Sequence, residues 1–351
     1  MVVSDPIVIW GAGAIGGTMG AHLVRAGQDV IFVDADAEHV AAINEHGLEI
    51  TGPVATFHVD AEASTPADFQ GTFRRVILCV KAQHTERAIR AIRPHLETDG
   101  YVVSAQNGLN ERLIAEHVGE ARTIGCFVNF GADYMEPGIV HFGGRGAVVV
   151  GELDGATTPR IQGLHSLLLQ FEPNAVLTSN IFGYLWSKMI YGAQLFATAV
   201  TNEGIADLLD DGRYRETFIR LADEVVAVAL AEGVRLESFN GFEPHAFLPG
   251  ASPKETTRSF DEMVAHNRRS AKSHSGIWRD LAVRKRPTEV DAQLGPVVTI
   301  GRQHGIDTPI TAHTIALIHE IESGKRQLDL ANLDELARLA DAAGRRAGTA
   351  A

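Results

Sequence analysis

Three glycines near the start of the chain have the spacing of a phosphate-binding turn. Gly11, Gly13 and Gly16 form G-x-G-x-x-G between an apolar run at residues 7–10 and a helical pattern at residues 14–26. At such a turn, backbone N–H groups and the start of the helix meet a pyrophosphate without interference from Cβ atoms. We therefore predict that a dinucleotide binds here. The residues of this predicted site are Gly11, Ala12, Gly13, Ala14, Ile15 and Gly16.

Asp34 indicates which dinucleotide is preferred. It ends the next β-like run, "DVIFVD", where a carboxylate accepts hydrogen bonds from the adenosine ribose and repels a 2′-phosphate. The segment "VDADAEHV" contains no Arg or Lys that would hold such a phosphate. The sequence thus favours NAD over NADP. The alternative is that Asp34, or Asp36, only caps a helix that begins near Glu38.

The order of the elements predicts what positions these residues. Strand-like runs at residues 74–82, 100–108 and 122–131 alternate with helical patterns, which is typical of a parallel sheet covered by helices. Beyond about residue 178 only long helical patterns follow. We therefore predict an α/β fold with two domains: residues 1–178 form a dinucleotide-binding domain of the Rossmann type, and residues 179–351 form an all-α domain.

Composition excludes several classes of protein. The 351 residues are 45% hydrophobic and 21% charged, as in ordinary globular proteins, and their formal net charge is −13. An acidic chain is unsuited to a polyanion, so we expect no nucleic-acid partner. The two cysteines are predicted to be core residues, with no disulfide or metal site. No apolar stretch has membrane-spanning length, so we expect a cytoplasmic protein without membrane contact.

Seven short stretches, in order along nearly the whole chain, carry a family resemblance. They are "GAGAIG", "CVKAQHTERAI", "SAQNGLNE", "EPGIVHFG", "WSKM", "RPTEVD" and "HGIDTP". Together they resemble the ketopantoate reductase (2-dehydropantoate 2-reductase) family. The resemblance implies a Rossmann domain and a helical domain of the 6-phosphogluconate-dehydrogenase-like type. It also implies a nicotinamide cofactor, NADP(H) by family default, a small-molecule 2-oxo acid substrate and a possible homodimer.

Lys188 and Glu289 are the predicted catalytic residues. Hydride transfer to a carbonyl builds negative charge on oxygen, which an ammonium both stabilises and protonates. Lys188 stands in the apolar segment "YLWSKMIYGAQLFA" and matches the family's catalytic lysine. Glu289, in "PTEVD", matches a glutamate that faces substrate and lysine. The alternatives are a surface lysine with an apolar stem and a solvated helix carboxylate.

Four further residues have roles implied by the resemblance or by charge. Asn107 matches an asparagine that seats cofactor and substrate, and Lys81 matches a lysine near the nicotinamide; the alternatives are an Asn-Gly turn and a solvated lysine at a helix start. Ser275 lies near the family's substrate-binding serine, with one extra residue before "TEVD". Arg279, about one helical turn on, is the candidate partner of a substrate carboxylate. Otherwise its cationic neighbourhood, residues 279–286, is a solvated helix face.

The lysine segment also departs from the family. Four and eight residues after Lys188, family members carry asparagines that contact the substrate, whereas this chain has Gly192 and Phe196. Lost amide groups favour a bulkier or less polar substrate than ketopantoate. We therefore expect an oxidoreductase that interconverts a 2-oxo acid and a 2-hydroxy acid. The alternatives are an NADPH-dependent 2-dehydropantoate 2-reductase of pantothenate biosynthesis and a non-catalytic NAD-sensing protein.

Overall fold

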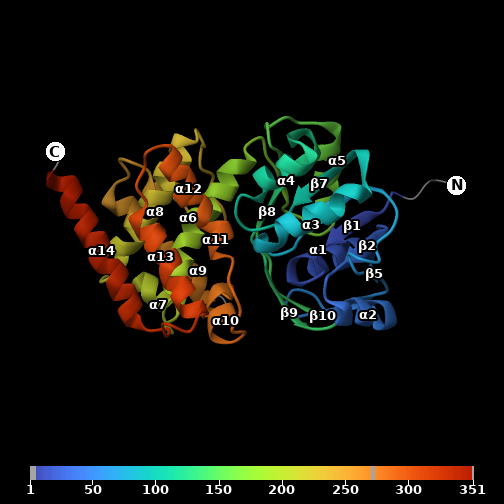
Figure 1. Ribbon diagram of the computed structural model, residues 1–351, viewed down its shortest axis with the longest axis horizontal. Coiled ribbons are helices and arrows are strands. Elements are labelled where there is room, and N and C mark those ends of the chain that lie inside the picture. Colours follow the sequence, from blue (N-terminus) through green and yellow to red (C-terminus); the bar gives the residue numbers. More distant parts are fainter. Residues whose placement is uncertain (1–4, 270–272, 350–351) are drawn as a thin grey trace. The chain divides into compact units, whose positions relative to one another are not determined.

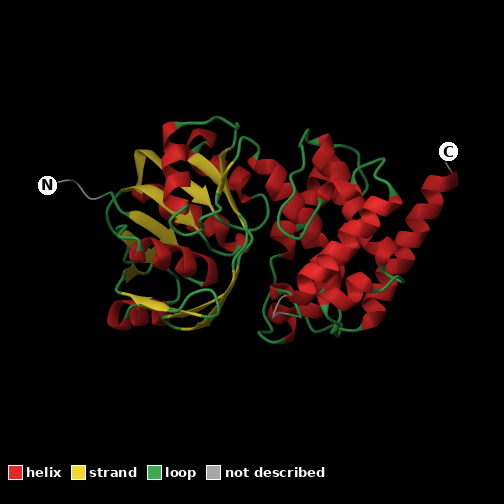
Figure 2. Cartoon of the chain, turned by 180° about the vertical axis from the view of Figure 1, so that it is seen from behind, coloured by secondary structure: helices red, strands yellow, loops and turns green. Residues whose placement is uncertain are grey.

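The computed structural model describes residues 5–269 and 273–349. The chain divides into two compact units, Met1–Ile181 and Phe182–Ala351. The first combines strands and helices, and the second is helical (Figures 1 and 2). The expected fold class is confirmed. In the part of the chain that the structure describes, no helix is long and apolar enough to cross a membrane.

An eight-stranded sheet forms the centre of the first unit. In spatial order its strands are β12 (Val176–Leu177), β11 (Val148–Glu152), β8 (Thr123–Val128), β7 (Leu96–Ser104), β6 (Phe73–Leu78), β1 (Ile7–Trp10), β2 (Val30–Val33) and β5 (Glu62–Ser64). Neighbours run parallel, except that β11 is antiparallel to β8. The chain moves outward from β1 in both directions, so β1 and β6 flank the switch point where doubly wound sheets bind ligands.

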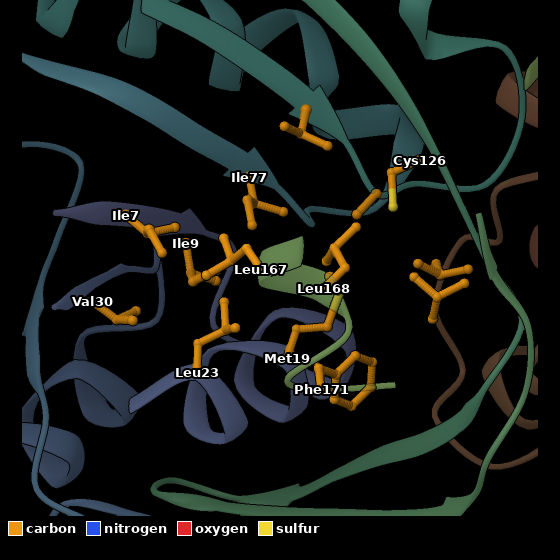
Figure 3. Close-up of a cluster of buried hydrophobic side chains, with 14 of the residues drawn as sticks. Ile7, Ile9, Met19, Leu23, Val30, Ile77, Cys126, Leu167, Leu168 and Phe171 are labelled. Atoms are coloured by element: carbon orange, nitrogen blue, oxygen red, sulfur yellow. The ribbon is translucent and has the colours of Figure 1, made fainter. Parts of the chain in front are cut away.

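Both faces of this sheet are buried by helices. The helices are α1 (Ala14–Arg25), α2 (Ala37–His46), α3 (Thr85–Ile92), α4 (Asn110–Val118) and α5 (Pro159–Leu168). Side chains of β1 alternate between two cores. Ile7 and Ile9 join the core that contains α1 and α5 residues (Figure 3), while Val8 and Trp10 join the core beneath α3 and α4. Burial on both faces explains the continuous apolar run of this strand.

A second sheet in the first unit was not predicted. Its four strands, in order, are β4 (Phe57–Val59), β3 (Leu48–Thr51), β10 (Ile139–Gly144) and β9 (Gly131–Glu136). The strands β3 and β10 lie far apart in sequence and pair through Ile50 and Val140. They are short and partly exposed, so local hydrophobic patterns gave no clear strand signal. Long-range pairing created this sheet.

The second unit is a bundle of helices. They are α6 (Ile181–Thr198), α7 (Ile205–Asp210), α8 (Arg215–Ala231), α9 (Pro253–Arg269), α10 (Gly276–Ala282), α11 (Val290–Gln293), α12 (Gly295–Gln303), α13 (Pro309–Glu322) and α14 (Leu330–Thr349). Helix α8 is central, because it packs against α12, α13 and α14. Helix α6 is largely buried, and its Trp186, Ile190 and Phe196 have no exposed surface.

Candidate active site

The three glycines of the predicted turn have different reasons to be glycine. Gly11 has a φ of +100°, and a Cβ there would lie 2.7 Å from the backbone nitrogen of Val80. A Cβ at Gly16 would overlap the carbonyl oxygen of Gly11. A Cβ at Gly13 would instead meet no described atom within 4 Å. The fold thus requires Gly11 and Gly16, whereas Gly13 keeps open the space at the first N–H groups of α1, the place where Rossmann-type domains hold the pyrophosphate of a dinucleotide.

Asp34 and Asp36 have separate structural roles. Asp34 Oδ2 accepts a hydrogen bond from the N–H of Ala12 at 2.7 Å, and its Oδ1 accepts from the N–H of Asp36 at 3.0 Å. Asp36 is the N-cap of α2 and accepts from the N–H groups of Glu38 and His39. Of the two aspartates considered as helix caps, Asp36 is therefore the cap. The carboxylate of Asp34 is held against the glycine turn.

The second sheet supports the side of the glycine turn on which Asp34 and Asp36 lie. His39 connects the turn to the segment between β9 and β10: its Nε2 lies 2.9 Å from the carbonyl oxygen of Ala12, and its Nδ1 lies 3.0 Å from the nitrogen of Gly138. The ring of Tyr134, from β9, packs edge-on against His39, and its hydroxyl donates to Asp36 Oδ2 at 3.2 Å. Burial and the neighbouring Asp36 carboxylate raise the pKa of Tyr134. The hydroxyl therefore stays protonated and available as a donor.

Lys81 and Asn107 follow the ends of neighbouring parallel strands, β6 and β7. Both are half-buried. The carbonyl of Lys81 accepts from the N–H of His84, so Lys81 does stand at a helix start. Gly108 has a φ of +93°, so Asn107 does belong to an Asn-Gly turn. Because both residues follow the ends of parallel strands, they lie at the carboxyl edge of the sheet, where ligands of this fold bind.

Three buried polar residues beside these loops were not predicted. Thr85 and Asn110 are the first residues of α3 and α4, and Gln106 precedes Asn107. They hydrogen bond to one another and to the backbone of the two loops. The available signal was a polar residue at the start of each of two otherwise amphipathic helices, but only tertiary contacts show that they meet.

Lys188 lies on the more open face of α6. Its immediate neighbours Ser187 and Met189 are buried, whereas Lys188 is half-buried. Beyond the first turn of α6, residues that are likewise not fully buried recur every three or four positions, which defines one helix face. This face, which we call the lysine face, consists of Tyr184, Lys188, Tyr191, Gly192 and Leu195.

The lysine face includes Gly192 but not Phe196. Gly192 is half-exposed, and a Cβ there would meet only Gln293 Oε1, at 3.5 Å. Phe196 has no exposed surface and packs in the core. Eight residues carry a helix about 80° past two full turns, whereas seven residues end within about 20° of them. The predicted substrate contact of Phe196 is therefore corrected, because Leu195 occupies this face instead.

An aromatic cluster borders the lysine face. The ring of Tyr191 stacks on Phe242, with centroids 5.4 Å apart, and Phe239 and Phe247 contact Phe242 in turn. The hydroxyl of Tyr191 accepts a hydrogen bond from Asn267 Nδ2 at 2.9 Å. Sequence analysis assigned no role to these phenylalanines. The cluster lends the lysine face an apolar border.

Glu289 precedes α11 and is half-buried. One turn later, Gln293 approaches Gly192 on α6. The stretch that begins with Glu289 therefore reaches the lysine face at Gly192, through the side chain of Gln293. Sequence reasoning had linked Glu289 and Lys188 only through the family resemblance, whereas here a contact of their neighbours joins the two segments.

Ser275 directly precedes α10, and Arg279 lies within that helix. Ser275 is the N-cap, and its Oγ accepts a hydrogen bond from the N–H of Trp278 at 3.2 Å. Arg279 lies one turn on and is half-buried. Ser275 thus has a local structural function in addition to the substrate contact that the resemblance implies.

The cationic run after Arg279 is not simply a solvated face. Arg284 and Arg286 both pair with the buried carboxylate of Asp280, at 3.3 and 2.9 Å, and so tie down the loop before Glu289. A pocket of about 490 Å³ in the helical unit is lined by Lys285 and Arg286, but by none of the predicted site residues. Within residues 5–269 and 273–349, no group of three or more His, Cys, Asp or Glu side chains has the arrangement of a metal site.

Comparison with known families decides what this arrangement belongs to. Residues 7–155 match the family described as "Ketopantoate reductase PanE/ApbA", and residues 180–322 match its C-terminal counterpart. The chain belongs to the ketopantoate reductase family. It is therefore an oxidoreductase, as the resemblance implied.

Relatives of this ketopantoate reductase family member span nearly all of the chain. The 2-dehydropantoate 2-reductase of Pyrococcus abyssi is 28% identical, covering 92% of this chain and 98% of its own, and that of Archaeoglobus fulgidus is 29% identical, covering 91% and 98%. A solved ketopantoate reductase from Ralstonia eutropha is 27% identical, covers 91% and 99%, and has a TM-score of 0.76. A D-mandelate dehydrogenase, solved with NADH and anilino(oxo)acetate, shares the fold at 22% identity, with coverage of 91% and 98% and a TM-score of 0.79.

Proposed function

We propose that this protein transfers a hydride between a nicotinamide cofactor and a 2-oxo acid or its 2-hydroxy acid, with Lys188 as the proton donor. The observation that carries the proposal is the position of Lys188. It lies half-buried on the open face of α6, one turn from Gly192, whose open space is bordered by the Gln293 side chain. Membership of the ketopantoate reductase family supports the same chemistry.

The residues of the chain have distinct tasks in this reaction. When bound, the cofactor supplies the hydride for the carbonyl carbon. The Lys188 ammonium donates a hydrogen bond to the carbonyl oxygen and gives it a proton as negative charge develops there. Glu289 orients the lysine and the substrate, and Asn107 and Lys81 seat the reacting groups. Ser275 contacts the substrate, and Arg279 pairs with the substrate carboxylate. In the oxidative direction, the neutral amine of Lys188 accepts the proton.

NAD is the proposed cofactor. The open space at Gly13 suits a pyrophosphate, as does the start of α1, where the N-cap residue Gly13 makes no side-chain hydrogen bond to the first N–H groups. The Asp34 carboxylate is held beside that turn by two backbone N–H groups and retains capacity for ribose hydroxyls. Asp36 and Glu38 add negative charge nearby, and residues 33–40 contain no Arg or Lys. A 2′-phosphate would meet like charges at this edge.

The proposed substrate is a 2-oxo acid with a bulkier or less polar side chain than ketopantoate. Gly192 leaves space on the lysine face, Leu195 offers an apolar group, and the cluster of Tyr191 and Phe242 adds an apolar border. With an NAD cofactor, the physiological direction is oxidation of the hydroxy acid, since cellular NAD pools are mostly oxidised.

The test is steady-state kinetics on wild type and Lys188→Ala. We expect Lys188→Ala to lower kcat by about 10²- to 10⁴-fold with an unchanged cofactor Kd. Lys254→Ala, which removes an exposed lysine from the start of α9, is the matched control and should leave kcat unchanged. Equal kcat in wild type and Lys188→Ala would contradict the catalytic role of Lys188. Cofactor binding without turnover of any 2-oxo acid by the wild type would favour the second candidate, a dinucleotide-sensing protein on the same fold.

The same assay separates the two reductase alternatives. NADH and NADPH are compared at matched concentrations, each with 2-dehydropantoate and with phenylglyoxylate. Our proposal predicts higher kcat/KM with NADH and phenylglyoxylate. The curated relatives are named 2-dehydropantoate 2-reductases, which keeps that activity as the competing assignment. A clear preference for NADPH and 2-dehydropantoate would establish it and overturn our assignments of Asp34 and Gly192.

A further inference from the structure

A chain of buried hydrogen bonds joins the two strand-end loops that carry Lys81 and Asn107. We propose that Thr85, Gln106 and Asn110 are positioning residues, which fix the backbone on which those two side chains stand. The inference rests on the proposed function, because that function places Lys81 and Asn107 against cofactor and substrate. We call the three residues the loop clamp.

Four hydrogen bonds make up the clamp. Gln106 Nε2 donates to the carbonyl oxygen of Val80 at 2.9 Å and to Thr85 Oγ1 at 2.8 Å. Thr85 Oγ1 donates to Asn110 Oδ1 at 3.0 Å. Asn110 Nδ2 donates to the carbonyl oxygen of Asn107 at 2.6 Å. One end of the clamp thus holds the residue before Lys81, and the other end holds Asn107 itself.

Each group in the clamp has a single allowed orientation. The Val80 carbonyl only accepts, so the Gln106 amide must present its NH₂ group there. The Thr85 hydroxyl accepts from that NH₂ and must send its own proton to Asn110. The Asn110 amide then presents its oxygen to Thr85 and its NH₂ to the Asn107 carbonyl, which again only accepts. The two backbone carbonyls therefore determine the direction of every bond between them.

Burial makes these bonds costly to lose. Thr85 has no exposed surface, and Gln106 and Asn110 are only 4% and 6% exposed. A buried donor or acceptor that loses its partner is not rescued by water, so breaking one link penalises its neighbours as well. Hydrophobic burial in the core under α3 and α4 is non-directional. The hydrogen bonds of the clamp are directional, so they define the position of the loops above that core.

The clamp also reaches the glycine turn. A Cβ on Gly11 would lie 2.7 Å from the nitrogen of Val80 and 3.0 Å from its Cγ1, so the turn packs directly on Val80. Gln106 holds the carbonyl of that same residue. The turn, the loop of Lys81 and the loop of Asn107 are consequently parts of one rigid support, which spans the switch point between β1 and β6 and the next strand, β7.

Thr85→Val is the decisive variant, because valine keeps the shape of threonine and removes the hydroxyl that joins both halves of the clamp. Thr85→Ser keeps the hydroxyl. Thr123→Val is the matched control: Thr123 is equally buried in the same unit, and its Oγ1 makes one bond, to the carbonyl of Gly119, outside the clamp. The kcat, substrate KM and NADH Kd are measured for wild type and for each variant, at a temperature below the lowest unfolding midpoint among these proteins.

We expect Thr85→Val to lower kcat by about 10- to 100-fold and to weaken NADH binding, since small misplacements of reacting groups have effects of this size. The kcat and NADH Kd of Thr85→Ser and of Thr123→Val should stay within about 3-fold of wild type. This should hold even where the two valine variants lower the unfolding midpoint by the same amount. The inference is overturned if the two valine variants have equal kcat and Kd, or if Thr85→Ser fails to restore them.

Failure of the proposed function has a different signature. Wild type that binds NADH but reduces no 2-oxo acid contradicts the proposed reaction, while the NADH Kd values of the three variants still decide the clamp. Asn107→Ala with unchanged kcat contradicts the assigned task of that side chain alone. A loss in Asn107→Ala without any loss in Thr85→Val contradicts the clamp alone.

Discussion

Glu111 should make the stability of the first unit depend on pH. It is the second residue of α4 and has no exposed surface. Burial raises its pKa to about 7, although its own backbone N–H and the nearby Ser104 hydroxyl offset part of that effect. Neither carboxylate oxygen completes a well-formed hydrogen bond within the described residues. We therefore predict that Glu111→Gln, a neutral variant of the same shape, stabilises the protein above neutral pH.

The sign and size follow from proton binding. An unfolded Glu titrates near 4.5, so between that pH and about 7 the folded protein binds more protons than the unfolded chain. Stability gained from the neutral carboxyl is therefore present at low pH and is lost as pH rises through 7. The difference of about 2.5 pH units corresponds to ~3 kcal/mol. The glutamine variant lacks this loss, so its advantage over wild type should grow by ~3 kcal/mol between pH 4.5 and pH 8.

Urea unfolding at a series of pH values, followed by circular dichroism, measures this change. Glu116→Gln is the control for loss of a carboxylate, because Glu116 lies on the same helix but is exposed, and the pH dependence of the Glu111→Gln difference should exceed that of this control. The ¹³C chemical shift of the Glu111 carboxyl in wild type provides a direct titration near pH 7. A Glu111→Gln difference that stays constant across the series, together with a carboxyl that titrates near 4.5, would refute the reasoning.

Three further outcomes are expected. Gly13→Ala should leave the unfolding midpoint unchanged but weaken NADH binding about 10-fold in calorimetry. Gly16→Ala should instead destabilise the protein by ~1–3 kcal/mol, because only a Cβ at Gly16 overlaps backbone. The reverse pattern would contradict the roles assigned to the two glycines. Gly192→Asn should fold normally and shift kcat/KM toward 2-dehydropantoate over phenylglyoxylate by roughly 10-fold, and no shift would exclude that position from substrate recognition. Glu224→Ala should cost about 1–3 kcal/mol in denaturant unfolding, since this carboxylate accepts three hydrogen bonds at the start of α13, and an unchanged midpoint would show that water replaces it.

Local patterns were enough to predict the framework of the first unit. The strand, glycine turn and helix around Gly13 depend on contacts between near neighbours, and the apolar run of β1 reflects burial on both faces. The position of Lys188 in a helix was equally readable. The sheet of β3, β4, β9 and β10 was missed, since its pairs join segments far apart in the chain.

The sequence by itself therefore determined the alternation of the main strands and helices in the first unit, the glycine turn and the family. The tertiary structure decided which residues share a surface: that Asp36 rather than Asp34 caps α2, that Leu195 rather than Phe196 joins Lys188, and that Thr85 meets Gln106. The physical reason is the range of the interactions. Helix periodicity and turn geometry act over a few residues, whereas burial and side-chain hydrogen bonds depend on segments that only folding brings together.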